Sequence, residues 1–248
     1  MDAASESRWN TTDFAAGYDE AAERVHPHYV AIQDVLLRQL APPARREWLV
    51  VDLGGGSGRL LERVLDRWPY ARAILIDQSE PFLVLAERRL ARFGARVQLI
   101  KACLQDNWPA ALAGPVDRLV SMSAIHHLDP DEKQTLFARC FLQLAPAGAF
   151  LNGDEVRAET DAAYLQSLQD WAGHMRSLMA ARQVAPAFHA AIEGWIERNV
   201  ARFGQPKLSG DDCHQTIGQQ LEYLAAAGFK SPECVWQRGL WAVFVARK

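Results

Sequence analysis

A glycine-rich turn, Gly54-Gly55-Gly56-Ser57-Gly58, most constrains what this chain can fold into. It follows the apolar run Trp48–Leu53 and precedes a stretch with leucines and valine at helical spacing. Glycine allows the backbone to turn tightly and to approach a ligand closely. The first turn of the following helix offers free N–H groups that suit an anionic or nucleotide ligand. The segment therefore predicts a strand, a ligand-binding turn and a helix.

The spacing of these glycines does not match the dinucleotide-binding pattern. That pattern is G-x-G-x-x-G, in which the third glycine lets the helix pack on the strand. Counted from Gly54 the third position holds Arg59, and counted from Gly56 it holds Leu61. A dinucleotide cofactor is therefore disfavoured.

Strand and helix patterns alternate after the turn. Apolar strand candidates lie at 73–76, 96–101, 116–122 and 148–152, and helical patterns lie between them at 81–93 and 131–144. A further helix at about 216–227 is followed by two β-rich runs, 233–237 and 240–246, that predict a closing hairpin. Continuous apolar strands that alternate with helices indicate a parallel sheet covered on both faces. We expect a doubly wound, mostly parallel seven-stranded α/β sheet with an antiparallel C-terminal strand.

The length of 248 residues corresponds to about 1.7 domains of ~150 residues. We expect an N-terminal helical cap at 1–45, with helices from about 12 to 23 and from Pro27 to about 41. The Rossmann-like cofactor-binding core should occupy 46–158 and be completed by 215–248. Residues 159–214 carry helical patterns without a strand candidate and predict a lid over the substrate.

Composition excludes several classes of partner. The net charge of −3 argues against a dedicated nucleic-acid binder. None of the four cysteines forms a C-x-x-C pair, so no metal site is expected from them. Residues 1–10 lack the apolar region of a signal peptide, and no apolar run of ~18 residues occurs, so we expect no membrane span and a cytoplasmic location. The expected partner is a small-molecule substrate, with a monomer or homodimer as the assembly.

The glycine turn belongs to a larger set of spaced residues. Gly54, Gly56 and Gly58 form G-x-G-x-G after Asp52, and Asp77 ends the next apolar run 23 residues beyond Gly54. This set resembles motif I and the following acidic residue of the class I S-adenosylmethionine-dependent methyltransferases. A carboxylate at such a position accepts hydrogen bonds from ribose hydroxyls, as in dinucleotide folds.

Three further segments carry the same resemblance. The stretch 123–128 follows the fourth strand, and 144–148 resembles an L-x-P-G-G turn in which Ala147 replaces the first glycine. The Leu-Ala-Ala-Ala-Gly-Phe segment at 224–229 precedes the closing hairpin. The resemblance covers about residues 13–158 and 215–248, and leaves 159–214 as the variable part.

The resemblance implies S-adenosyl-L-methionine as cofactor, S-adenosyl-L-homocysteine as product, and methyl transfer to an O, N or C nucleophile of a small molecule. The cofactor-binding residues it implies are Tyr18, Asp52, Gly54, Gly55, Gly56, Gly58, Asp77, Gln78, Cys103, Leu104, Ser121 and Met122. Tyr18 belongs to the segment 9–19, which resembles a cap over the cofactor and in which Trp9 and Phe14 are staple or pocket candidates. Cys103 departs from the family, since many relatives have an aspartate there that binds adenine. A thiol is a weak acceptor, so the backbone at Cys103 and Leu104 or the side chain of Asp106 would have to hold the base.

His126, His127 and Asp154 are the candidate catalytic residues, because they follow strands whose carboxyl ends carry ligands in open α/β sheets. A histidine can take a proton from the acceptor at neutral pH, although either ring could also only pack beside the cofactor. Asp154, with its neighbour Glu155, could orient an acceptor or only cap a helix. The fourth strand lacks the N/D-P-P-Y/F tetrad of methyltransferases that act on planar exocyclic amines.

Three alternatives to small-molecule methylation stay open. The chain could use S-adenosylmethionine for other chemistry, such as formation of its carboxylated derivative. It could be a degenerate fold that only binds the cofactor, for which Cys103 is the best support. An RNA methyltransferase is the most distant of the three.

Overall fold

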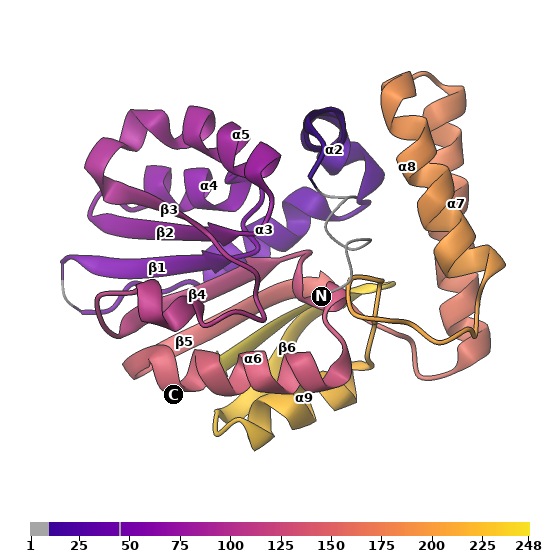
Figure 1. Cartoon of the computed structure of the whole chain (residues 1–248). Helices are drawn as coiled ribbons and strands as arrows, with labels where there is room; N and C mark the ends of the chain where they lie inside the picture. Colours follow the sequence, from indigo (N-terminus) through magenta and orange to yellow (C-terminus); the bar gives the residue numbers. More distant parts are fainter. Residues whose placement is uncertain (1–9, 45) are drawn as a thin grey trace.

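The computed structural model describes residues 10–44 and 46–248, which form one seven-stranded sheet with helices on both faces (Figure 1). The strands are β1 (Trp48–Leu53), β2 (Ala71–Asp77), β3 (Val97–Lys101), β4 (Val116–Met122), β5 (Leu144–Glu155), β6 (Lys230–Arg238) and β7 (Trp241–Arg247). Their order in the sheet is β3-β2-β1-β4-β5-β7-β6. Trp9, a predicted staple or pocket residue of the cap, lies outside the described residues.

The directions of the strands confirm the predicted fold class. β1 pairs in parallel with β2 and β4, and the parallel pairing extends to β3 and β5. β7 runs antiparallel to both of its neighbours, β5 and β6, so it is the strand that runs against the others. The chain order reverses between β1 and β4, and open α/β sheets bind ligands at the carboxyl ends of the strands at such a point.

Helices cover both faces of the sheet, as the alternating patterns predict. The helices are α2 (Thr12–Val25), α3 (Tyr29–Gln39), α4 (Arg59–Arg67), α5 (Glu80–Leu90), α6 (Pro130–Gln143), α7 (Asp161–Ala180), α8 (Pro186–Ile196) and α9 (Ile217–Ala226). Figure 1 shows α3, α4 and α5 on one face and α6 and α9 on the other. Short helical segments are η1 (Ala91–Arg96), η2 (Trp108–Ala111), η3 (Ile125–His127) and η4 (Glu197–Ala201).

Two hydrophobic cores result from this layering. Val50 and Val51 are both fully buried, yet Val50 packs in the core on the α3–α5 side and Val51 in the core on the α6–α9 side. Alternate residues of a strand point to opposite faces, so a strand buried on both faces must be apolar throughout. This is the reason for the continuous apolar runs in the sequence.

Several element boundaries differ from the sequence-based expectation by a few residues, and two of them have a clear backbone cause. The second helix begins at Tyr29, because Pro27 lies in the turn between α2 and α3. β5 begins at Leu144, four residues before the expected 148, and includes Ala147 with φ of +61°. Ala147 thus adopts the left-handed conformation that glycine takes more easily, which explains why relatives carry a glycine at this turn.

The 159–214 segment packs on the rest of the chain and shares its core. Figure 1 shows α7 and α8 side by side at one end of the sheet, near α2. Trp171 of α7 donates its indole N–H to the carbonyl oxygen of Val25 at 2.6 Å, and its ring lies 4.8 Å from that of Trp241. Trp171, Met175 and Phe188 belong to the same core as β1 and α4.

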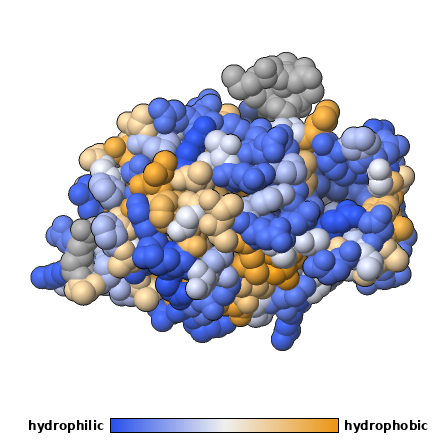
Figure 2. Space-filling view, turned by 90° about the horizontal axis from the view of Figure 1, so that it is seen from below, coloured by the Kyte–Doolittle hydropathy of each residue, from blue (hydrophilic) through white to orange (hydrophobic). Residues whose placement is uncertain are grey.

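In the described part of the chain, no helix has the length and apolar character needed to cross a bilayer. The face drawn in Figure 2 carries mostly hydrophilic residues, with apolar residues in small groups. This is the pattern expected when amphipathic helices turn their apolar stripes inward.

Candidate active site

A cavity of about 580 Å³ lies at the carboxyl ends of β1, β2, β4 and β5. The glycine turn forms one end of it, and a cluster of histidines and carboxylates forms the other. Its side walls come from α2, α5, α7 and α8. The residues that line it include Phe14, Tyr18, His26, Asp52, Gly54, Gly55, Gly56, Asp77, Gln78, Phe82, Met122, His126, His127, Glu155, Trp171, Phe188 and Asp212.

The glycine turn has the backbone conformation that its sequence predicts. Gly54, Gly56 and Gly58 have φ angles of +68°, +53° and +80°. A Cβ on Gly54 would lie 2.5 Å from Cβ of Ala124, and one on Gly55 would lie 2.7 Å from Cγ of Leu75. Gly54 is therefore required on both conformational and steric grounds, Gly55 on steric grounds, and Gly56 is favoured by its backbone conformation.

Gly58 serves a different purpose from the other glycines. It is the N-cap residue of α4, and it is not among the residues that line the cavity. A Cβ at this position would lie 2.9 Å from Cδ1 of Leu90 on α5. Because glycine has no Cβ, α4 and α5 can pack closely beside the turn.

Asp77 holds the turn through its side chain. One carboxylate oxygen accepts the N–H of Gly56 at 2.8 Å, and the other accepts the N–H of Ser79 at 2.8 Å. Burial raises the pKa of Asp77, although these backbone hydrogen bonds oppose the shift. Asp77 also lines the cavity.

Asp52 presents a buried polar atom that the protein leaves without a partner. Its side chain lines the cavity, and its Oδ1 atom has no hydrogen-bond partner among the described residues. Burial, with a contribution from the charge of Asp77, raises the pKa of Asp52 to about 8. Such an atom calls for a donor or cation from a ligand.

Helix α2 is fastened to the glycine turn by Asp19. Its carboxylate accepts hydrogen bonds from Ser57 Oγ at 2.5 Å, Arg59 Nε at 2.9 Å and Arg89 Nη2 at 2.8 Å. Although burial opposes the shift, these hydrogen bonds and the two arginines lower the pKa of Asp19. The clamp keeps α2, and Tyr18 with it, over the cavity.

Aromatic rings from three helices form the apolar wall. The ring of Tyr18 lies 5.8 Å from Phe82 of α5 and 6.2 Å from Phe188 of α8. Phe14 lies 5.5 Å from Phe188. The Tyr18 hydroxyl shares a hydrogen bond of 3.0 Å with Nε2 of His26, and burial holds the pKa of Tyr18 well above its usual value.

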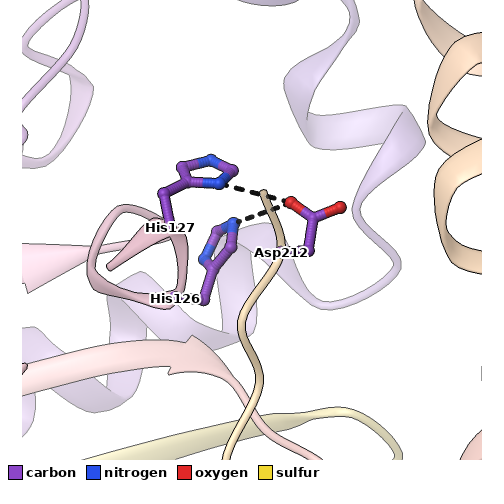
Figure 3. Close-up of side chains that lie close together, drawn as sticks. All are labelled: His126, His127 and Asp212. Carbon is purple, nitrogen blue, oxygen red and sulfur yellow. Dashed lines mark ion pairs between the residues drawn. The ribbon is translucent and has the colours of Figure 1, made fainter. Parts of the chain in front are cut away.

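The other end of the cavity is a cluster of buried ionisable groups. Nδ1 of His126 lies 2.6 Å from Oδ1 of Asp154, and its Nε2 lies 3.6 Å from Glu155 and 3.7 Å from Asp212. Nδ1 of His127 lies 3.3 Å from the same oxygen of Asp212. Figure 3 shows both rings directed toward the Asp212 carboxylate, which approaches from a separate segment of the chain.

The carboxylates of this cluster set the charge of His126. Burial by itself would lower the pKa of His126, but Glu155, Asp154 and Asp212 together raise it to about 9. In return, and against the effect of burial, His126 lowers the pKa values of Asp154 and Glu155. The cluster therefore stabilises positive charge at the end of the cavity.

Several predicted site residues lie near the cavity without lining it. Asp154 is fully buried and accepts the Nδ1–H and the backbone N–H of His126. Ser121 is fully buried and donates its hydroxyl to the carbonyl oxygen of Leu53 at 2.7 Å. Cys103 and Leu104 follow β3, and neither lines the cavity. Asp106 accepts the backbone N–H of Cys103 at 2.9 Å and does not line the cavity either.

The sequence-based site omitted four residues of the cluster. These are His26, Tyr164, Asp212 and His214. Asp212 and His214 follow η4, and two backbone hydrogen bonds of 2.8 Å, from Gly210 to His127 and from Cys213 to His126, hold their segment against η3. No motif or spacing in the sequence links these positions to η3.

The fold and the site together define a class of protein. Residues 50–148 match the family model described as a methyltransferase domain. Residues 50–148 therefore carry a methyltransferase domain, and the sheet order, the glycine turn and the cavity at the switch point are those of the class I S-adenosylmethionine-dependent methyltransferase fold.

Three curated relatives show how far the likeness extends. The ribosomal RNA small subunit methyltransferase H of Nocardioides sp. is 31% identical over 168 residues, which are 64% of this chain and 52% of that protein. The trans-aconitate 2-methyltransferase of Variovorax paradoxus is 34% identical over 56% of this chain and 47% of its own length. The carboxy-S-adenosyl-L-methionine synthase of Nautilia profundicola is 21% identical over 95% of this chain and 92% of its own. The chain thus spans about half the length of the first two.

Solved structures share the fold. An O-methyltransferase family protein from Burkholderia thailandensis aligns with a TM-score of 0.64 and 17% identity, over 95% of this chain and 59% of that one. The complex of DhpI with S-adenosylhomocysteine aligns with a TM-score of 0.61 and 15% identity, over 98% and 96% of the two chains.

The residues present fit the cofactor of this superfamily. The turn at Gly54–Gly56 lines the cavity and carries no side chains, so the backbone itself can contact a ligand there. Asp52 offers an unpartnered buried oxygen, and Asp77 lies at the end of β2 beside Gln78. These three features face one cavity.

Proposed function

We propose that the chain transfers a methyl group from S-adenosylmethionine to an O, N or C nucleophile of a small molecule. The observation that carries the proposal is the single cavity that runs from the glycine turn to the histidine–carboxylate cluster. One end suits the cofactor and the other end is a polar surface for an acceptor. Between them lies an aromatic wall of ordinary ligand-site character.

The cofactor end is formed by residues of this chain with distinct tasks. Asp77 and Gln78 would bind the ribose, and Asp52 would accept a hydrogen bond from a donor of the cofactor. The backbone at Cys103 and Leu104, expected from the sequence to hold the adenine, does not line the cavity. When bound, S-adenosylmethionine supplies a methyl group that is already activated for transfer. Because transfer is chiefly a problem of alignment, correct positioning can supply ~7–11 kcal/mol of the rate enhancement.

The acceptor end would orient the nucleophile against two imidazole rings. His126 and His127 both line the cavity, and their ring centroids lie 3.9 Å apart. Asp154 acts through His126, because its bond to Nδ1 fixes the orientation of that ring. Asp154 is therefore a positioning residue in this proposal. That one of the histidines removes a proton stays a prediction.

The form of the cavity favours a small acceptor over RNA. Aromatic side chains from α2, α7 and α8 enclose it, and the chain carries a net charge of −3. An RNA substrate would require a positively charged surface around the entrance. Helices α7 and α8 would act as the lid predicted for 159–214. Several relatives methylate ribosomal RNA by name, so the acceptor class is a point for experiment.

A binding experiment tests the cofactor end. Calorimetry of the purified chain should give saturable binding of S-adenosylmethionine and S-adenosylhomocysteine. Asp77→Ala removes the acceptor of two backbone N–H groups and of the ribose, and should weaken binding at least 10-fold. Asp131→Asn, in the exposed first turn of α6, is the matched control and should bind normally. Absence of binding at high micromolar ligand would exclude the proposal.

A labelling experiment tests the acceptor class. A cell extract is separated into small molecules and RNA, and each fraction is incubated with the chain and S-adenosylmethionine carrying a labelled methyl group. Label should enter the small-molecule fraction and be absent with Asp77→Ala. Label confined to RNA would instead place the chain with its ribosomal RNA-modifying relatives.

Conversion of the cofactor itself is the second candidate. The chain aligns over nearly its whole length with a carboxy-S-adenosyl-L-methionine synthase, although at 21% identity. The mass of any nucleoside that copurifies distinguishes the two. A carboxylated derivative would support this second function, and S-adenosylmethionine or S-adenosylhomocysteine the first.

A further inference from the structure

We propose that His126, Glu155 and His214 bind a divalent first-row transition-metal ion at the acceptor end of the cavity, with Asp212 as a neighbouring fourth donor. The proposal concerns binding, and it holds whether or not the chain transfers methyl groups. Donor atoms of His126, Glu155 and His214 lie within 4.8 Å of one another, and all three residues are buried. Imidazole and carboxylate together suit zinc, iron, cobalt or nickel better than magnesium or calcium.

The separations around His126 fit a shared ion better than they fit hydrogen bonds. Nε2 of His126 lies 3.6 Å from Oε2 of Glu155 and 3.7 Å from Oδ1 of Asp212, both longer than an ordinary N–H···O bond of 2.7–3.2 Å. An ion about 2.1 Å from each atom would subtend an angle of about 120°. The 3.1 Å between Nε2 of His214 and Oε2 of Glu155 corresponds to about 95°. These angles bracket the tetrahedral value.

The hydrogen bonds behind the donors leave the correct nitrogens for an ion. Nδ1 of His126 is bonded to Asp154 at 2.6 Å, and Nδ1 of His214 is bonded to the hydroxyl of Tyr164 at 2.6 Å. A proton on Nδ1 of His126 leaves the Nε2 lone pair of that ring free, whereas Nε2 of His214 donates to Oε2 of Glu155 at 3.1 Å, a bond that a bound ion would replace. Histidines that bind metals almost always donate their other N–H in this way, and often to a carboxylate.

The charge of the cluster also calls for a cation. Asp154, Glu155 and Asp212 are 0%, 1% and 4% exposed. Within the described ranges, every ion pair of these carboxylates is with a histidine. Lys133, which is fully buried nearby, donates instead to the carbonyl oxygen of Cys213 and the side chain of Gln215. Buried carboxylates are costly unless they are paired or coordinate a metal.

A further buried nitrogen atom, on His26, lies close to the carboxylate of Glu155. Nδ1 of His26 lies 3.8 Å from Oε1 of Glu155 and has no hydrogen-bond partner among the described residues. It lines the cavity on the side of α2. Glu155, His126 and Asp212 also line the cavity, and His214 does not, so the open side of the site faces the acceptor. An oxygen atom of the acceptor could complete the coordination there.

Metal binding is tested on the whole chain without cofactor. The protein is treated with a chelator, desalted and titrated with Zn²⁺ by calorimetry, and its metal content is then measured by mass spectrometry. We expect about one equivalent of Zn²⁺. His126→Gln and His214→Gln should each lower the affinity at least 10-fold, whereas His189→Gln, which removes a histidine of α8 outside the cavity, should leave it unchanged. Absence of binding, or binding that His126→Gln does not weaken, would overturn the proposal.

Two further measurements decide cases that these variants leave open. His127→Gln tests the other candidate group, His126, His127 and Asp212, which Figure 3 draws. A loss with His127→Gln but not with His214→Gln would overturn the assigned donors. If a variant fails to fold, the visible spectrum of Co²⁺ bound to the unmodified chain decides. Intense bands of four- or five-coordinate cobalt support the site, and the weak bands of hydrated six-coordinate cobalt refute it. Retained binding of S-adenosylmethionine shows that the cofactor end is intact, so failure here is distinct from failure of the proposed function.

Discussion

Replacement of Asp52 by asparagine should stabilise the chain in the absence of cofactor. The side chain of Asp52 is 1% exposed, and burial raises its pKa to about 8 from an ordinary value of 3.8. Between these two pH values the folded chain keeps a proton that the unfolded chain has lost. The free energy of unfolding therefore falls as pH rises through this interval, and levels off above pH 8. Asparagine does not ionise, so the variant does not lose this part of the free energy of unfolding as pH rises.

The size of the effect follows from the displacement of the pKa. Each unit of pKa corresponds to about 1.4 kcal/mol. At pH 5.5 the variant should exceed the wild type by about 2 kcal/mol, and at pH 7 by about 4 kcal/mol. For a chain of this length, the larger difference corresponds to a rise in Tm of roughly 10 °C. The wild-type chain would thus be less stable than the variant because it keeps an unpartnered buried carboxyl group for a ligand. Such a loss of stability is common at functional sites.

Urea denaturation at pH 5.5, 7 and 8.5, followed by circular dichroism without cofactor, measures these differences. Asp131→Asn removes one negative charge from an exposed position and should change the free energy of unfolding by less than about 0.5 kcal/mol. S-adenosylmethionine binding by Asp52→Asn should weaken by 10- to 100-fold, opposite in sign to the stability. A stability difference that stays constant from pH 5.5 to 8.5, or a destabilised variant, would refute the reasoning.

Three other variants test separate parts of the site. Gly54→Ala should weaken cofactor binding at least 10-fold in calorimetry, because its Cβ would lie 2.5 Å from that of Ala124 at a φ of +68°, and Ala124→Gly in the same chain should recover only the steric part. Asp154→Asn should weaken Zn²⁺ binding 10- to 100-fold, because Asp154 bonds to Nδ1 of His126, and should leave the affinity for S-adenosylmethionine unchanged. An equal loss of both affinities would show that Asp154 has only a structural role. Asp19→Asn should raise the rate of amide hydrogen exchange in α2, as measured by mass spectrometry, because the Asp19 carboxylate bonds to Arg59 and Arg89. An unchanged rate would show that other contacts hold α2 in place.

The fold was predictable because its determinants are local and periodic. The continuous apolar runs of β1 and β2 and the helices between them predict a parallel sheet buried on both faces. The positive φ values at Gly54, Gly56 and Gly58 strongly favour glycine, so the sequence itself indicates the turn. Asp77 follows at a spacing fixed by one helix and one strand. Boundaries were less certain, as Ala147 shows, because an alanine gives no sign of a left-handed conformation.

The glycine-turn end of the cavity could therefore be predicted from the sequence, and the histidine–carboxylate end only in part. His126 and His127 stand out because they follow a strand whose carboxyl end faces ligands. Ser121 and Asp154 were equally prominent by position, yet their side chains turn to the carbonyl oxygen of Leu53 and to His126, away from the cavity. Sequence position gives the edge of the sheet, whereas the direction of a side chain depends on the packing around it.

The sequence by itself determined the class of fold, the strand order implied by that class, and the glycine turn at one end of the cavity. Only the tertiary structure brought Asp212 and His214 to His126, across more than eighty residues of sequence, through backbone hydrogen bonds between their loop and η3. It also placed His26, from the turn between α2 and α3, beside Glu155. Contacts of this kind have no period and no fixed spacing, because they depend on how separate segments pack against each other. The conformation of the glycine turn depends on a few adjacent residues, and for that reason it can be predicted from the sequence.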